Sequence, residues 1–465
     1  MSGDPFNRLD PTNWRFFQSY HSWFRSYLMI IFLKVMGYVL RFFHLGSGAT
    51  WPGEVFLEFY HRPLVYFIPK FKEGIIFVAG TNGKTTTTSM IVSLLEKSEG
   101  GKIVTNDTGA NLLNGVISAC INAYSWSGNT DFDWGVFEVD ENSLPSVLMN
   151  VQCSMPNEKK IVLILLNLFR DQLDRYGEVD AIARKWEKAL RMLPSHAQLI
   201  LNADDPQIAY FGKSVKLKTH YFGINQKENY LKIKDHAIDS AYCPNCWNSL
   251  TYEGIYFSHL GIWRCDKCGF KRPPVANINI KSHLPGLYSL YNLYAAYLAG
   301  AAAGISKEDT EKTLSDFKPA FGRQEEVEID RKKVKIFLSK NPAGFNASIR
   351  AVLDLKPKAI LLVLNDRIPD GRDVSWIYDV DFEIVPPIVS VICSGDRVYD
   401  MVVRMKYAIK HWNNETMKQL MVEEKLSDAL KRGLSMLNKR ETLYVLPTYS
   451  AMLETRKILT GKKIL

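Results

Sequence analysis

The chain has 465 residues, which is enough for two to four domains with well-buried cores. Its hydrophobic fraction of 46% and charged fraction of 23% are ordinary for a globular protein, and no internal repeat or low-complexity segment is present. The net charge of +9 comes from scattered basic residues, so charge alone gives little reason to expect a nucleic-acid partner.

Cysteine usage and the first residues bear on the compartment. Four of the 7 cysteines form two close pairs, and Cys120, Cys153 and Cys393 stand apart. This usage indicates a reducing compartment and excludes a disulfide framework. Residues 1–11 carry two aspartates, and no small-residue cleavage site follows the later apolar run, so no secretory signal is predicted. We expect a cytoplasmic protein.

Residues 1–70 are predicted to form an N-terminal helical region. Its most apolar run, Tyr27–Leu45, lacks the uncharged stretch of ~18 residues that a membrane-spanning helix needs. Polar or small residues recur in it at helical spacing and make a narrow stripe: Lys34, Gly37, Tyr38, Arg41 and His44. Two interpretations stay open, a helix packed on its own protein or an interfacial helix peripheral to the cytoplasmic face of a membrane.

A glycine-rich turn is the most informative feature of the chain. Residues 74–78 indicate a buried strand and residues 85–97 a helix. The turn between them contains Gly80, Thr81, Asn82, Gly83, Lys84, Thr85 and Thr86. Backbone N–H groups at such a helix start face a phosphate, Lys84 adds a cation, and the Thr85 hydroxyl is placed to ligate Mg²⁺. The sequence therefore predicts a P-loop for ATP or GTP.

From 71 to 321 the sequence alternates strands and helices, which predicts a mostly parallel sheet covered on both faces. The strand candidates are Ile75–Val78, Trp134–Val139, Ile161–Leu166 and Gln198–Leu201. Glu138 ends the second of these, at the sheet edge where such folds bind ligands, and we expect it to hold Mg²⁺. Its neighbours Asp140 and Glu141 are equally compatible with solvated surface charge.

Two pairs of cysteines interrupt this pattern within residues 242–273. Cys243 and Cys246 form the first pair, and Cys265 and Cys268 the second. The spacing is that of a four-cysteine zinc site, and four thiolates leave no position for substrate water. The segment is therefore predicted to be an inserted zinc ribbon with a structural role.

An α/β pattern restarts after residue 322, and residues 322–465 are predicted to form a separate Rossmann-like domain. Its strand candidates are Val334–Leu338, Ala359–Leu364, Val389–Cys393 and Leu443–Leu446. Residues 365–376 concentrate arginines and aspartates after one strand, which favours a functional rim over a salt-bridged loop. Lys340–Asn346 is expected to face the interdomain cleft, and Asn292 to read an adenine or cap a helix. The segment 202–206 is compatible with a rim or with a helix cap.

In this order, the motifs resemble the MurT family, the Mur-ligase-like subunits of lipid II isoglutaminyl synthase. The P-loop is shared with all Mur ligases, whereas the cysteine insertion together with Asp370-Gly-Arg-Asp373 is specific to this family. The resemblance covers residues 71–465 and implies a Mur-ligase-type central domain. It also implies ATP-dependent amidation of the D-glutamate α-carboxylate of lipid II, using ammonia from a GatD-type glutamine amidotransferase.

The resemblance implies roles for individual residues. Lys84 and Thr85 would hold phosphates and Mg²⁺, and Glu138 would supply a Mg²⁺ carboxylate. Asn292 and Arg323 would face ATP. Asp373 would reach into the partner's active site and orient its histidine as the third member of a triad.

Two other functions remain to be weighed. One is an amino-acid-adding ligase of the Mur or folylpolyglutamate type, against which the cysteine insertion and residues 370–376 argue. The other, from a different class, is a zinc-containing nucleic-acid-binding regulator, which would bind DNA or RNA in a salt-sensitive way.

Overall fold

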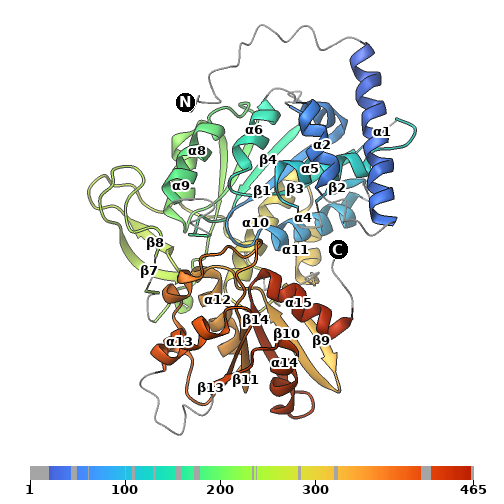
Figure 1. Ribbon diagram of the computed structural model, residues 1–465. Helices are drawn as coiled ribbons and strands as arrows, with labels where there is room; N and C mark the ends of the chain where they lie inside the picture. The colour runs from blue at the N-terminus through green and yellow to red at the C-terminus, as the bar shows by residue number, and fades with distance from the viewer. Residues whose placement is uncertain are drawn as a thin grey trace, which may run out of the picture.

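The computed structural model describes residues 20–42, 50–60, 62–99, 101–106, 110–128, 132–152, 159–171, 179–232, 235–236, 238–280, 284–318, 323–409 and 420–461. His44 and Cys153 lie outside the described residues. Figure 1 shows two α/β units, one above the other, with a two-stranded arm at one side.

The first unit is built on a six-stranded sheet in the order β2-β3-β1-β4-β5-β6. All five pairings are parallel, as the sequence predicts. The continuous apolar runs of its central strands explain why they are buried on both faces. The strands are β1 (Phe71–Ala79), β2 (Ile103–Thr105), β3 (Phe132–Val139), β4 (Lys160–Leu165), β5 (Gln198–Asn202) and β6 (Lys218–Phe222).

Helices cover both faces of this sheet and create two separate cores. One face packs against α4 (Lys84–Glu99), α10 (Tyr288–Ala303) and α11 (Lys307–Ser315). The other packs against α2 (Trp51–Phe59), α3 (Leu64–Phe67), α5 (Leu113–Ala123), α6 (Leu144–Gln152), α8 (Val179–Leu190) and α9 (Pro206–Ser214). The P-loop lies between β1 and α4, at the carboxyl edge of the sheet.

The second unit has a six-stranded sheet in the order β13-β12-β11-β14-β10-β9. Four of its pairings are parallel, and only β9 runs antiparallel to its neighbour β10. Its strands are β9 (Arg323–Ile329), β10 (Lys332–Phe337), β11 (Ala359–Val363), β12 (Ser390–Ser394), β13 (Leu420–Val422) and β14 (Thr442–Pro447). Its helices are α12 (Pro342–Asp354), α13 (Val398–Ala408), α14 (Leu426–Ser435) and α15 (Tyr449–Thr460).

The insertion between β6 and α10 forms an antiparallel hairpin of β7 (Thr251–Phe257) and β8 (Leu260–Arg264). It projects from the side of the first unit (Figure 1). One cysteine pair precedes this hairpin and the other follows it, so closing the hairpin brings the two pairs together.

The N-terminal helix α1 (Tyr20–Phe42) packs on its own protein, as one of the two sequence interpretations expects. Two residues of the polar stripe face inward: Lys34 and Gly37 are buried, and the Lys34 ammonium donates to the Tyr124 carbonyl, whereas Tyr38 is half exposed. Ile30 and Leu33 share that inner face. Among the described residues, no helix has the length and apolar character needed to cross a membrane.

Candidate active site

The P-loop conformation depends on its two glycines. Gly80 and Gly83 have φ of +139° and +92°, values that residues with a side chain rarely adopt. A Cβ at Gly83 would lie 2.2 Å from Oδ1 of Asn292, and one at Gly80 would lie 2.9 Å from Cβ of Leu166. The loop therefore brings its backbone close to α10 and to the residues that follow β4, and α4 begins at its end.

A strand neighbour holds this loop in place. The Asn167 side chain accepts from the backbone N–H of Asn82 at 2.8 Å and donates to its carbonyl at 3.0 Å. The Thr81 hydroxyl exchanges hydrogen bonds with the backbone of Phe169. Asn167 and Phe169, which follow β4, thus support the P-loop through an amide side chain and the backbone, a role that the sequence alone does not reveal.

Lys84 is buried, and its ammonium lies against the P-loop backbone. Its ammonium donates to the carbonyls of Gly80 at 2.5 Å and Thr81 at 3.2 Å, and pairs with Glu141 at 3.2 Å. Burial raises the pKa of Glu141, but the Lys84 and Lys340 charges outweigh it, and the net direction is downward. The interpretation of Glu141 as solvated surface charge is therefore wrong, because its carboxylate is buried against a cation.

The neighbouring Asp140 is buried as well, so the solvated interpretation is also wrong for this residue. Burial and the nearby Glu141 charge raise the pKa of Asp140. Two carboxylates and one lysine thus lie together in a low-dielectric environment at the carboxyl edge of the sheet. Adding an anionic phosphate here requires further positive charge.

Thr85 and Glu138 lie as a divalent-cation site would require. The Thr85 hydroxyl donates to Oε2 of Glu138 at 2.5 Å, and Nδ2 of Asn111 donates to Oε1 at 3.3 Å. Asn106 fixes the Glu138 backbone on both sides. Mg²⁺ ligands at about 2.1 Å in octahedral geometry stand about 3 Å apart, so these two oxygens fit adjacent positions of such an ion.

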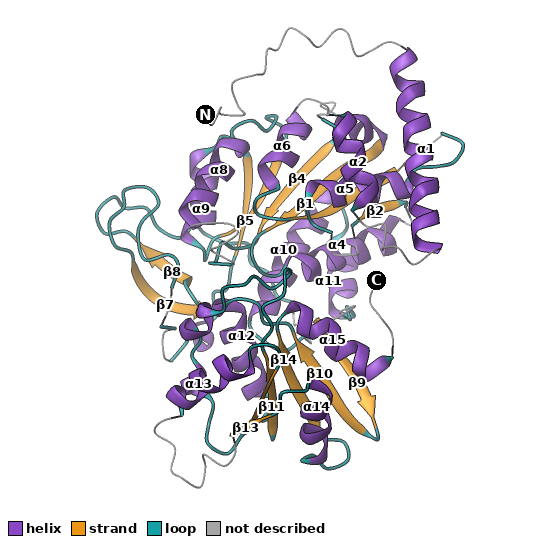
Figure 2. Cartoon of the chain, in the orientation of Figure 1, coloured by secondary structure: helices purple, strands orange, loops and turns teal. Residues whose placement is uncertain are grey.

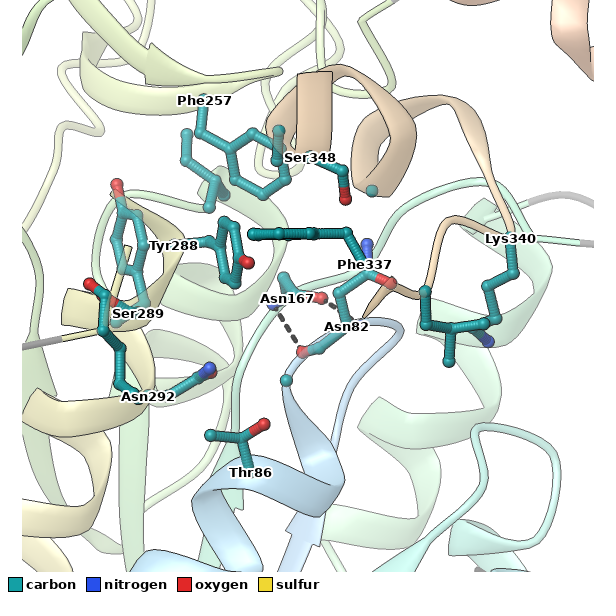
Figure 3. Close-up of a pocket in the computed structure, with 17 residues that line it drawn as sticks. Asn82, Thr86, Asn167, Phe257, Tyr288, Ser289, Asn292, Phe337, Lys340 and Ser348 are labelled. Atoms are coloured by element: carbon teal, nitrogen blue, oxygen red, sulfur yellow. Dashed lines mark hydrogen bonds between the residues drawn. The ribbon is translucent and has the colours of Figure 1, made fainter. Parts of the chain in front are cut away.

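A pocket of about 930 Å³, counting the open space at its mouth, lies beside the P-loop and between the two units. Figure 3 shows rings of Phe257, Tyr288 and Phe337 at one end and Thr86 and Asn292 toward the other. An apolar end suits a flat base, and the P-loop end suits phosphates. Nothing in the sequence singles out Phe257, Tyr288 or Phe337, because they come from three distant segments.

Asn292 lies in the second turn of α10, whose N-cap is Leu287, so the helix-cap interpretation is wrong. Its amide oxygen lies 3.4 Å from the Thr87 hydroxyl. The next pocket residue, Tyr291, donates to Asp204 at 2.8 Å, and Asp204 also accepts from Arg272. Burial raises the pKa of Asp204 although Arg272 opposes it.

The segment 202–206 contains both a helix cap, Asp205, and the residue that bonds Tyr291, Asp204. Asp205 caps α9 by accepting from the backbone N–H groups of Gln207 and Ile208 at 2.9 and 3.1 Å. Its other oxygen accepts from the N–H of Leu168 at 2.9 Å. The cap interpretation is therefore confirmed for Asp205, and the adjacent Asp204 holds a pocket residue.

Side-chain contacts tie the second unit to the P-loop. Asn341 and Asn82 exchange hydrogen bonds at 3.3 and 3.2 Å, and Lys340 pairs with Asp171. The predicted position of Lys340–Asn346 at the interdomain cleft is thus confirmed. Arg323 begins β9 opposite Phe337 of β10, so its backbone lies beside a pocket residue; its side chain lies outside the described part of the chain.

The charged loop 365–376 divides into two parts. Arg367 pairs with Asp396 at 2.7 Å, and Asp370 is buried and accepts from the backbone N–H of Ser450 at 2.8 Å. Asp373, by contrast, is exposed and accepts from the backbone N–H of Ser375 at 2.8 Å, which lowers its pKa. The loop is therefore salt-bridged along its first half and presents Asp373 to the outside.

The four cysteines of the insertion converge on one point. Their sulfurs all lie within 4.8 Å of one another, with 3.6 Å between Cys243 and Cys268 and 3.5 Å between Cys246 and Cys265. Thiolates bound tetrahedrally at about 2.3 Å stand about 3.8 Å apart, so the residues present fit a zinc ion. The ion would join the two ends of the β7–β8 hairpin.

A P-loop on a parallel sheet, faced by a second α/β unit, defines a Mur-ligase-type enzyme. Residues 78–300 match the Mur ligase middle domain. A pseudomurein peptide ligase type C from Methanothermus fervidus has the same fold, with a TM-score of 0.62 at 22% identity over 86% of this chain and 81% of that chain.

Within that class the chain belongs to the MurT family. Residues 338–452 match the MurT ligase C-terminal family. The chain is 30% identical to the MurT subunit of glutamine-hydrolysing lipid II isoglutaminyl synthase from Streptococcus pneumoniae, over 90% of this chain and 94% of that protein. The corresponding subunit from Staphylococcus aureus is 31% identical over 72% and 78% of the two chains.

Proposed function

We propose that this chain is the ATP-dependent synthetase subunit of a lipid II isoglutaminyl synthase. It would amidate the α-carboxylate of D-glutamate in the stem peptide of lipid II, giving D-isoglutamine for peptidoglycan synthesis. The observation that carries this proposal is the buried Lys84 beside the Thr85–Glu138 pair, in a chain whose second unit matches the MurT C-terminal family.

The reaction has two balanced steps. A carboxylate oxygen attacks the γ-phosphorus of ATP and ADP leaves, which gives an acyl phosphate. Ammonia nitrogen then attacks the acyl carbon, phosphate leaves, and the nitrogen loses a proton. A carboxylate is a poor electrophile, and phosphorylation supplies the leaving group that it lacks. The ammonia comes from glutamine hydrolysis by a GatD-type partner subunit.

The P-loop residues position the nucleotide. Backbone N–H groups from Gly83 to Thr86, at the start of α4, would face its phosphates, and the buried Lys84 would neutralise charge on the transferring group. Asn82 and Gly83 shape the loop. Asn292 lies at the same pocket and contacts the nucleotide, and we assign Arg323 to the same role.

Two metals belong to this proposal. Thr85 and Glu138 would hold Mg²⁺, which when bound shields the phosphate charge during transfer. Cys243, Cys246, Cys265 and Cys268 would hold a structural Zn²⁺, since four thiolates complete its shell.

We further propose the limits of the domains and their tasks. Residues 1–70 form the N-terminal helical region, 71–321 the ATP-binding domain with the zinc ribbon at 242–273, and 322–465 the domain that meets the glutaminase. Asp373 on that last domain orients the histidine of the partner's active site. The complex works in the cytoplasm, peripheral to the inner face of the membrane that holds lipid II.

Reconstitution tests this function. The chain is supplied with ATP, Mg²⁺ and lipid II, together with either ammonium or a mixture of free amino acids, and products are identified by mass spectrometry. We expect a loss of about 1 Da per modified peptide, since a hydroxyl is replaced by an amino group, in the ammonium reaction only. Incorporation of an amino acid would instead assign an amino-acid-adding ligase. Absence of ATP turnover with lipid II and partner present, together with salt-sensitive binding of DNA or RNA, would favour the nucleic-acid regulator.

A further inference from the structure

The outer face of α1 is apolar, which is the reverse of what a helix on a water-facing surface requires. Four residues at spacings of four, three and four form one stripe: Leu28, Phe32, Val35 and Val39. Their exposed fractions are 49%, 56%, 44% and 39%. We call these four residues the α1 stripe. It covers three turns, or roughly 16 Å along the helix axis.

The stripe is outward because the polar groups of α1 are used on the inner face. Lys34 reaches the Tyr124 carbonyl and lies 4.9 Å from the centre of the Trp126 ring. Ser26 exchanges a hydrogen bond with the Tyr60 hydroxyl at 2.9 Å. These contacts fix the rotation of α1, so the apolar stripe stays exposed. Figure 1 shows α1 at the outer edge of the first unit.

Aromatic rings flank this stripe. Tyr38 stacks on Trp126 with ring centroids 5.9 Å apart, and the two are about half exposed. The Tyr27 hydroxyl donates to the Trp126 carbonyl at 2.7 Å and holds that loop on the helix. Tyrosine and tryptophan combine an apolar body with a polar tip, which suits the headgroup level of a bilayer.

We propose that the α1 stripe is a docking surface for an anionic lipid bilayer. The stripe and its aromatic flank would enter the headgroup boundary, with the helix lying in the plane of the surface. Charge supports this occupant: besides the inward-facing Lys34, the α1 sequence carries Arg25 and Arg41 and no acidic residue. A second copy of the chain would bring two segments of the same positive sign together, whereas an anionic headgroup layer is complementary to them.

The biological role of this docking rests on the proposed function, because that function has a lipid-linked substrate. A lipid-linked peptide moves only in the plane of the membrane, so an enzyme held at that surface meets it in two dimensions. Docking by α1 leaves the P-loop, the cysteine cluster and Asp373 uninvolved, because none of them lies on this helix.

Vesicle flotation of the full chain tests the surface. The test variant is Leu28→Gln, Phe32→Gln, Val35→Gln and Val39→Gln, since glutamine preserves helix propensity. The matched control changes four exposed apolar residues of the second unit: Leu355→Gln, Ile388→Gln, Val422→Gln and Ile458→Gln. Vesicles contain phosphatidylcholine alone or mixed with phosphatidylglycerol. We expect the unmodified chain and the control to float with the mixed vesicles. The α1 variant should bind these vesicles at least roughly tenfold more weakly.

Three results would overturn the proposal: no binding of the unmodified chain to mixed vesicles, equal loss in the control, or unchanged binding of the α1 variant. If the unmodified chain forms a dimer and does not bind vesicles, and the α1 variant is a monomer, the stripe would be assigned to a second copy of the chain. Circular dichroism checks that the variant is folded. Amidation of a water-soluble muramyl peptide separates the two proposals, because we expect the α1 variant to retain it within about twofold while losing activity on vesicle-borne lipid II. If the unmodified chain does not amidate the water-soluble muramyl peptide, the proposed function is contradicted. The vesicle-binding result would then still test the docking surface independently.

Discussion

Asn82 of the P-loop and Asn341 of the second unit hold each other through two side-chain hydrogen bonds, of 3.3 and 3.2 Å, although 259 positions separate them in the chain. Asn341 is also the N-cap of α12, accepting from the backbone N–H of Gly344 at 2.8 Å. One residue therefore begins a helix and contacts the phosphate loop.

Substitutions at Asn341 can separate these two tasks. Asn341→Ala removes both, and we expect a loss of about 1 kcal/mol in the free energy of unfolding together with slower amidation. Asn341→Ser keeps a capping hydroxyl, which is too short to reach Asn82. It should retain stability within about 0.5 kcal/mol and still lower kcat. Thermal unfolding and ATP-dependent kinetics measure the two effects, and normal kcat in the serine variant would show that the Asn82 contact is dispensable.

Lys84→Met should abolish amidation with ammonium and with glutamine, because both need the acyl phosphate. Since the variant leaves Glu141 buried without its cation, it should also lose about 3 kcal/mol of stability. The double variant Lys84→Met, Glu141→Gln removes the unpaired carboxylate of Glu141, so it should recover stability and stay inactive. Activity of either variant would remove Lys84 from the proposed chemistry.

The same pair predicts a pH dependence with a definite sign. The folded-state pKa of Glu141 lies below its ordinary 4.5, so its stabilising contribution is present above pH 4.5 and is lost as the pH falls through the lowered value. In Lys84→Met the largest opposing charge is gone, burial dominates, and the pKa of Glu141 rises. We therefore expect the variant to lose stability relative to the unmodified chain as the pH rises from about 5 to 8, as measured by urea unfolding. A constant difference across this range would contradict the coupling.

The sequence predicts much of both sheets because their central strands are continuous apolar runs, as in β4 and β11. It did not predict β9, since Arg-Gln-Glu-Glu-Val-Glu-Ile is mostly polar and charged, which is common in edge strands but gives no apolar run. The three-residue strands β2 and β13 are also edges and too short to give a pattern.

The candidate site shows the same division. The P-loop occupies one short segment, so the spacing of its glycines and Lys84 is enough to predict it. The aromatic end of the pocket is assembled from Phe257 in the insertion, Tyr288 in α10 and Phe337 in β10. Nothing in one segment indicates the other two, because Phe257 and Tyr288 meet only when the first unit folds, and Phe337 comes from the second unit.

The zinc prediction connects the insertion to the nucleotide pocket. Phe257 and Leu260 line that pocket and belong to the hairpin whose ends carry the four cysteines. Cys265→Ser should lower the zinc content measured by atomic absorption, reduce the melting temperature, and raise the KM for ATP several-fold. Cys393→Ser removes a buried thiol from the second unit and should leave the zinc content unchanged. Full zinc content in Cys265→Ser would contradict the four-cysteine site.

Asp373→Asn separates the two sources of ammonia. An asparagine oxygen still accepts from the backbone N–H of Ser375, so the turn should be preserved, but the negative charge that orients a histidine is lost. We expect glutamine-driven amidation to fall by about 100-fold or more, and ammonium-driven amidation to stay within about twofold. Asp366→Asn is the matched control, since that carboxylate pairs with Arg397 at 3.0 Å within this chain and should affect neither reaction. Equal loss of both reactions in Asp373→Asn would place this residue in the synthetase chemistry rather than in the partner's triad.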